Sequence, residues 1–99
     1  MSEGLRIERV DAATVRVGGT LGFANANEGV SRSDELLGGS GASVDLGGLT
    51  HPDSATLGVL LIWAARAGAR GLKIRFTNVP AGLRALAHLC DAEGLLGIA

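Results

Sequence analysis

Three polar side chains that lie close together in the sequence, His51, Asp53 and Ser54, are the residue types of a nucleophilic site. In such a site an aspartate orients a histidine, which takes the proton from an attacking serine. Residues this close on one loop seldom converge in that geometry, and no Gly-x-Ser-x-Gly turn surrounds Ser54. Asp53 and Ser54 fit a capping role better, because side-chain oxygens at a helix start accept hydrogen bonds from unpaired N–H groups. Capping would leave the Ser54 hydroxyl near the surface, within reach of a partner or a kinase.

The other residues that could bind metals, react or hold nucleotides form no complete site. His51 and His88 lie on different segments without the further ligands that zinc requires. Cys90 is the only cysteine, which excludes an internal disulfide, and it falls on the apolar side of the last predicted helix, so we expect it in the core. The glycine-rich segment 38–41 leads into a strand and is followed by no Gly-Lys-Ser/Thr, so we expect a helix end and a linker there. The sequence therefore predicts no enzyme, no metal site and no cofactor.

The elements that position Asp53 and Ser54 follow from the spacing of the apolar residues. Alternating and helical patterns predict, in order, strand, strand, helix, strand, helix, strand and helix over residues 5–10, 14–19, 23–37, 42–46, 54–68, 72–76 and 81–90. The later strands are joined by helices and should be parallel, whereas the first two form a hairpin. We expect one α/β domain with a mixed, mostly parallel four-stranded sheet and helices packed on it, a loose N-terminus at residues 1–4, and an apolar tail at 93–98 that docks.

Size and charge limit the possible partners and location. Ninety-nine residues suit one domain, and a net charge of −1 with three aromatic residues predicts no nucleic-acid surface. The longest apolar run, residues 57–65, is far shorter than the roughly 18 residues of a spanning helix, and no signal segment is evident. We expect a cytoplasmic protein that reaches a membrane only indirectly, through a partner.

The long predicted helix at 54–68 has apolar residues on two sides. Leu57, Leu60, Leu61, Ala64 and Gly68 share one side, and Val59, Ile62, Trp63 and Arg66 stand opposite, with Thr56 a turn or two earlier. Aromatic and aliphatic residues beside an arginine are common at interfaces, so Ile62 and Trp63 fit a docking patch. Alternatively, the C-terminal helix or tail covers Trp63 and completes the core. Under the docking interpretation the partner-binding residues are Asp53, Ser54, Thr56, Val59, Ile62, Trp63 and Arg66.

Three segments resemble STAS domains. Residues 44–63, VDLGGLTHPDSATLGVLLIW, resemble the family's central motif, in which a strand ending in Asp-Leu/Ile-Ser-Gly-x-x-x-x-Asp-Ser/Thr runs into an apolar helix. Residues 19–21, Gly-Thr-Leu, resemble the Gly-x-Leu at the end of the second strand, and residues 72–89 resemble the last strand and helix. The resemblance covers roughly residues 5–97 and implies a single SpoIIAA-like STAS domain.

Within the family the chain looks most like MlaB-like proteins, because of its small size and the Leu-Leu-Ile-Trp run in the helix. Those proteins are cytoplasmic STAS subunits of the ABC transporter that moves phospholipid to keep the Gram-negative outer membrane asymmetric. The resemblance implies that the partner is an MlaF-like ATPase subunit and that the chain lies at the periphery of the inner membrane through this partner. It also implies a non-enzymatic, supporting role.

The alternative that the resemblance implies is an anti-sigma factor antagonist. Ser54 falls on the hydroxyl position that is phosphorylated in those proteins by an anti-sigma factor kinase. Two residues depart from that pattern: Gly22 stands where antagonists usually carry an acidic residue, and Thr56 where they usually carry glycine. Both departures weaken the case for a kinase substrate. Gly47 replaces the serine that usually follows the strand, which is a minor change.

Overall fold

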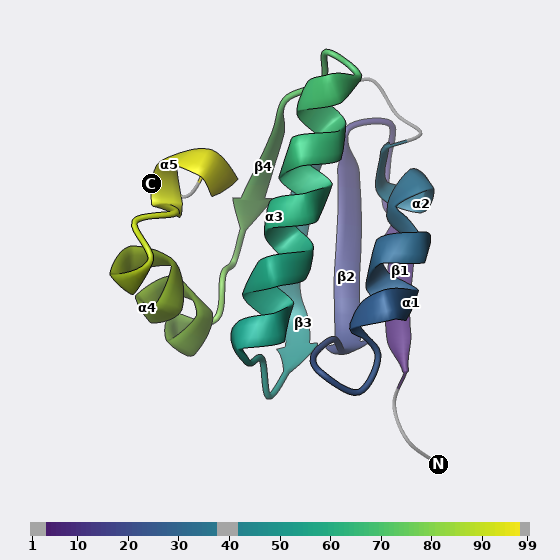
Figure 1. Ribbon diagram of the computed structural model, residues 1–99. Coiled ribbons are helices and arrows are strands. Elements are labelled where there is room, and N and C mark those ends of the chain that lie inside the picture. The colour runs from purple at the N-terminus through teal and green to yellow at the C-terminus, as the bar shows by residue number, and fades with distance from the viewer. Residues whose placement is uncertain (1–3, 38–41, 98–99) are drawn as a thin grey trace.

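A four-stranded sheet forms the centre of the computed structural model, which describes residues 4–37 and 42–97 (Figure 1). Its strands, in spatial order, are β1 (Leu5–Arg9), β2 (Thr14–Thr20), β3 (Ala42–Thr50) and β4 (Ile74–Thr77). β1 pairs with β2 antiparallel, while β2 with β3 and β3 with β4 are parallel. The predicted mixed, mostly parallel sheet is confirmed. Residues 1–3 of the predicted loose N-terminus and the predicted linker at 38–41 lie outside the described residues.

Helices lie over one face of the sheet and beside β4 (Figure 1). They are α1 (Ala26–Ser31), α2 (Ser33–Leu37), α3 (Ser54–Ala69), α4 (Ala81–Leu89) and α5 (Glu93–Leu96). None of these helices has the length and apolar character needed to cross a membrane. α3 runs in front of β2 and β3, with α1 and α2 on one side of it and α4 and α5 on the other (Figure 1).

The single helix predicted over 23–37 is wrong. The chain first makes a turn in which the Gly22 amide donates to Asn25 Oδ1 at 3.0 Å and Asn25 Nδ2 donates to the Thr20 carbonyl at 2.7 Å. Asn25 thus satisfies the backbone at the end of β2, and helix α1 starts only after it. Arg32 then ends α1 and separates it from α2.

The core lies between the sheet and α3. Alternate strand residues such as Val15 and Val44 point into it, as the period of two predicts, and Leu60 of α3 meets them fully buried. The expectation that Cys90 lies in the core is wrong: α4 ends at Leu89, and the Cys90 side chain is exposed. Leu96 of α5 is fully buried, which confirms that the apolar tail docks.

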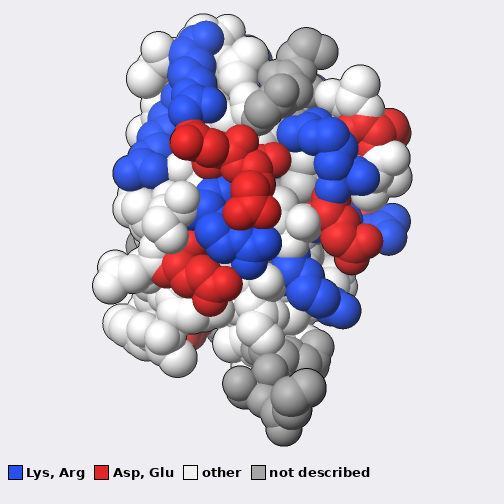
Figure 2. Space-filling model, turned by 90° about the vertical axis from the view of Figure 1, so that its right-hand side faces the viewer, with Lys and Arg blue, Asp and Glu red and all other residues white. Residues whose placement is uncertain are grey.

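Charged side chains fasten α1 and α2 to the edge of the sheet. Arg32 donates to the Leu5 carbonyl of β1 at 2.8 Å and pairs with Glu28 and Glu35. Figure 2 shows cations and carboxylates interspersed over this side of the molecule. Because the side chains of an edge strand and its neighbours are charged here, the open edge of β1 is a poor template for pairing with another chain.

The face of the sheet opposite α3 is polar and includes one aspartate with a shifted pKa. Asp45 Oδ1 accepts the Gly47 amide at 2.8 Å and Asn78 Nδ2 at 3.1 Å, and Arg16 lies 3.9 Å from its other oxygen. The Gly47 amide, then Asn78, hold the pKa of Asp45 below its ordinary value of 3.8. The carboxylate therefore links the middle of β3 to the end of β4 in its charged form.

Candidate functional site at the start of helix α3

Asp53 and Thr56 form a reciprocal cap at the start of α3. Asp53 Oδ1 accepts the Thr56 amide at 3.1 Å, and Thr56 Oγ1 accepts the Asp53 amide at 2.9 Å. This pairing satisfies two backbone donors at the helix start. Such a cap stabilises a helix by about 1 kcal/mol.

The same two side chains connect α3 to the end of β2. The Thr56 hydroxyl is fully buried and donates to the Leu21 carbonyl, while Asp53 Oδ2 accepts the Phe23 amide at 3.2 Å. A Cβ at Gly22 would lie 2.6 Å from Asp53 Oδ2, so a side chain there would displace the carboxylate. The two departures from the antagonist pattern, Gly22 and Thr56, thus both belong to this connection.

Hydrogen bonds keep Asp53 ionised. Burial alone would raise the pKa of Asp53, but bonds from the backbone amides of Phe23, Thr56 and Ala55 outweigh it and hold the pKa below 3.8. A carboxylate that already accepts these bonds serves as a structural acceptor at the helix start. The predicted cap is confirmed for Asp53, whereas its capping partner is Thr56 and not Ser54.

Two side chains project outward from this connection. Ser54 is exposed at the first position of α3, and Phe23 is 76% exposed in the loop after β2. The two loops that carry them lie side by side at the same end of the sheet (Figure 1). The sequence predicts Phe23 at the start of a helix over residues 23–37, whereas the structure places it in the loop before α1. The signal that could have placed it in the loop is the pair Gly22 and Asn25 on either side of it.

The geometry does not assemble a triad of His51, Asp53 and Ser54. Both oxygens of Asp53 accept backbone amides, as described above, and His51 is exposed with a left-handed backbone at φ 49°. Within residues 4–37 and 42–97, no three His, Cys, Asp or Glu side chains come together as a metal site would require. His88 lies far along the chain on α4, where its Nδ1 is 2.9 Å from Glu93 Oε1.

The prediction that Thr56, Val59 and Trp63 belong to a docking patch on the outer side of α3 is wrong, because all three side chains are buried. Trp63 is 0% exposed and its indole N–H donates to the Gly29 carbonyl at 2.9 Å. A Cβ at Gly29 would lie 3.1 Å from Val59, so α1 packs closely on this side of α3. A helix that is apolar on two sides is here buried on both. The alternative interpretation placed Trp63 in the core, which is correct, but it named the C-terminal helix or tail as the covering segment. The segment that bonds to Trp63 directly is α1.

The remaining residues of the predicted docking patch differ in exposure. Ile62 is 39% exposed and lies two turns along α3 from Ser54. Arg66 is also exposed, but its guanidinium donates to the Val30 carbonyl at 2.9 Å and to Ser33 Oγ at 2.6 Å, which ties it to α1 and α2. Of the predicted patch on α3, Ser54, Ile62 and Arg66 are exposed, and hydrogen bonds hold Arg66 against α1 and α2.

Comparisons with known proteins agree with this architecture. A protein-family profile described as "Mlab, STAS domain" matches residues 6–97. Among solved structures, the chain is similar to the anti-sigma factor antagonist SpoIIAA in its unphosphorylated form, with a TM-score of 0.65 and 15% identity over 87% of this chain and 83% of that one. At that identity the likeness concerns the fold. A comparison with curated proteins finds no match. The profile spans nearly the whole chain, and the chain therefore belongs to the family of MlaB-type STAS domains.

Proposed function

We propose that the protein is a non-enzymatic subunit that binds the ATPase of a phospholipid-transport ABC complex. The family supports this role, since its profile carries the Mlab description. In this proposal the chain acts in the cytoplasm and reaches the inner membrane only through its MlaF-like partner. Its contribution is a rigid surface that supports the ATPase subunit.

The observation that carries the proposal is the exposed Phe23 held beside Ser54. Phe23 is 76% exposed and so offers apolar surface that a partner can cover, and aromatic residues are enriched among the side chains that dominate binding energies. The Asp53 bond to the Phe23 amide fixes the position of this loop against α3. We define the docking surface as Phe23, Ser54 and Ile62, in place of the patch that included the buried Val59 and Trp63.

Capture of the ATPase encoded beside this chain tests the proposal. Wild-type protein should co-purify with the ATPase, and Phe23→Ala should weaken binding at least about tenfold, as loss of a central aromatic contact does. Ser54→Glu should also weaken it, since a charge would be placed in an apolar contact, whereas glutamate at a helix start is compatible with folding. Leu89→Ala is the matched control, because Leu89 is 80% exposed on α4, outside the docking surface. If the ATPase does not bind wild-type protein, the proposed function is wrong.

The second candidate is an anti-sigma factor antagonist switched by phosphorylation of Ser54. Two observations favour it: the fold of SpoIIAA, and an exposed hydroxyl at the first position of a helix. A phosphate would add a charge of roughly −2 beside the Asp53 carboxylate and would disrupt the docking surface by repulsion and desolvation. Incubation with a cognate anti-sigma factor kinase and ATP, followed by mass spectrometry, tests this candidate, with Ser54→Ala as the control. A chain that gains no phosphate at Ser54 removes it.

A further inference from the structure

We propose a second binding site, for an amphiphile with one acyl chain and an anionic head, in a groove between α3 and α5. The groove lies toward the C-terminal half of α3. Its apolar end is a hollow of about 390 Å³ lined by Leu61, Ala64, Ala65 and Leu95. Leu95 is 72% exposed although it belongs to a helix that otherwise docks on the core. An exposed leucine that forms one wall of an apolar hollow is surface that an acyl chain can cover.

The groove continues along α3 toward the start of β4. A second hollow of about 390 Å³ shares Ala64 and Leu95 with the first and extends past Gly68 and Leu72 to Lys73. Gly68 contributes no side chain to this wall, and a Cβ there would meet nothing within 4 Å, so the groove stays open above it. An occupant can therefore run from the apolar hollow past Gly68 and Leu72 to the Lys73 side chain.

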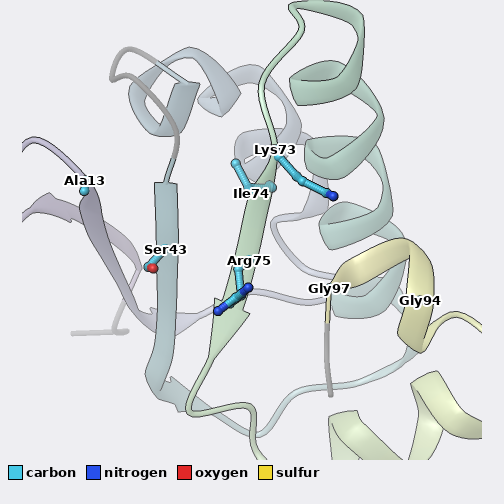
Figure 3. Close-up of a pocket in the computed structure, with 7 residues that line it drawn as sticks. All are labelled: Ala13, Ser43, Lys73, Ile74, Arg75, Gly94 and Gly97. Atoms are coloured by element: carbon cyan, nitrogen blue, oxygen red, sulfur yellow. The ribbon is translucent and has the colours of Figure 1, made fainter.

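Two cations stand at the other end of the groove. A third hollow, of about 550 Å³, is lined by Lys73 and Arg75 together with Ser43 and two glycines of the α5 segment. Lys73 lines both this hollow and the second one. Figure 3 shows the Lys73 side chain reaching toward α3, while Arg75 lies farther along β4. Among the described residues that line this hollow there is no carboxylate, and the nearby Glu93 is bonded to His88. The charge of this end therefore complements an anionic group.

The dimensions and polarity suit a small amphiphile. Each hollow falls within the roughly 300–1,000 Å³ of small-molecule sites. Polarity changes in one direction, from leucine and alanine at one end to lysine, arginine and serine at the other. A single acyl chain with a carboxylate or phosphate head has the same gradient.

Fluorescence titration of the full chain with cis-parinarate, a long-chain fatty acid, tests the site. We expect saturable binding with one molecule per chain, and displacement by palmitate. Leu95→Asp should weaken binding about tenfold because it places a charge in the apolar hollow, while Leu89→Asp, which alters an equally exposed leucine outside the groove, should bind as wild type does. Urea unfolding of both variants checks that they remain folded.

The head group is tested separately. The double substitution Lys73→Gln with Arg75→Gln should weaken cis-parinarate binding. It should leave unchanged the dissociation constant of uncharged hexadecanol, obtained from competition after correction for the affinity of the probe. Arg84→Gln on α4 should alter neither dissociation constant. In the wild type, amide resonances of Gly68, Gly94 and Gly97 should shift on titration with palmitate. The proposal is wrong if Leu89→Asp weakens binding as much as Leu95→Asp, or if the chain binds phosphatidylglycerol vesicles but not monomeric fatty acid. It is also wrong if Leu95→Asp abolishes ATPase capture and leaves cis-parinarate binding intact, since the groove would then be a protein contact.

Discussion

Replacing Thr56 by valine would remove one buried hydroxyl and retain the branched shape of the side chain. The hydroxyl donates to the Leu21 carbonyl and accepts the Asp53 amide at 2.9 Å. Both bonds would be lost, while the bond from the Thr56 amide to Asp53 Oδ1 does not involve the hydroxyl and would remain. The substitution therefore separates the connection between α3 and β2 from the packing of the helix.

The expected loss follows from the two groups left unpaired. A buried carbonyl without a partner costs about 1–3 kcal/mol, and loss of half of the helix cap costs about 1 kcal/mol more. We expect the free energy of unfolding to fall by about 2–4 kcal/mol. Since a domain of this kind is stable by about 5–15 kcal/mol, the variant should still fold. Its midpoint of thermal unfolding should fall by at least about 8 °C.

Urea unfolding followed by circular dichroism and by Trp63 fluorescence measures this change, because Trp63 is the only tryptophan and is buried against α1. Thr14→Val is the matched control: Thr14 is half-buried on β2, and its hydroxyl makes no hydrogen bond within the described part of the chain. We expect the control to change stability by less than about 0.5 kcal/mol. If Thr56→Val loses no more than Thr14→Val, the hydroxyl does not hold α3 to β2 and the reasoning is refuted.

Three further predictions concern other parts of the fold. The pKa of Asp45 is lowered from 3.8 in the folded chain, so its contribution to stability is present above that value and lost as the pH falls through the folded-state pKa. Below about pH 4, the free energy of unfolding measured in urea should therefore fall less steeply with decreasing pH for Asp45→Asn than for wild type. An equal pH dependence in the two proteins would contradict this. Trp63→Phe should cost about 1–3 kcal/mol by urea unfolding because it leaves the buried Gly29 carbonyl without its indole donor, and a loss below about 0.5 kcal/mol would show that the bond contributes little. Gly19→Ala should lower the free energy of unfolding by more than about 1 kcal/mol in the same assay. The reason is that Gly19 has φ 79° and that a Cβ there would lie 2.0 Å from the Gly4 carbonyl oxygen. An unchanged free energy of unfolding would mean that the backbone shifts at no cost to avoid this contact.

The sheet and the long helix could be predicted from the sequence because their signals are local. Alternation places residues of β1 and β2 on the two faces of a hairpin, and the observed strands begin at the predicted residues, Leu5 and Thr14. The start of α3 could be predicted as well, since an aspartate before a serine is a capping signal that depends on a few neighbouring residues. Fold class follows from these elements and their order.

The environment of α3 could not be predicted in this way, because it depends on contacts between distant segments. Trp63 is buried by α1, whose close approach requires the missing side chain of Gly29, more than 30 residues earlier. On sequence alone that glycine only weakens a helix. Phe23 was misplaced for a similar reason: its apolar side chain fits a helical pattern, but the hydrogen bonds of Asn25 take the chain out of a helix at that point. The predicted and the observed candidate sites thus share the start of α3 and differ in the residues that surround it.

The bond between Asp53 and the Phe23 amide has a consequence for how fast a partner leaves. It joins two loops from different strands through one carboxylate, so their relative position is set before any partner arrives. Binding then orders little beyond the Phe23 side chain itself. The entropy cost of about 0.5–1.5 kcal/mol per immobilised side chain therefore applies to few side chains. Because encounter rates vary little among variants of one interface, loosening this bond should shorten the lifetime of a complex more than it slows its formation.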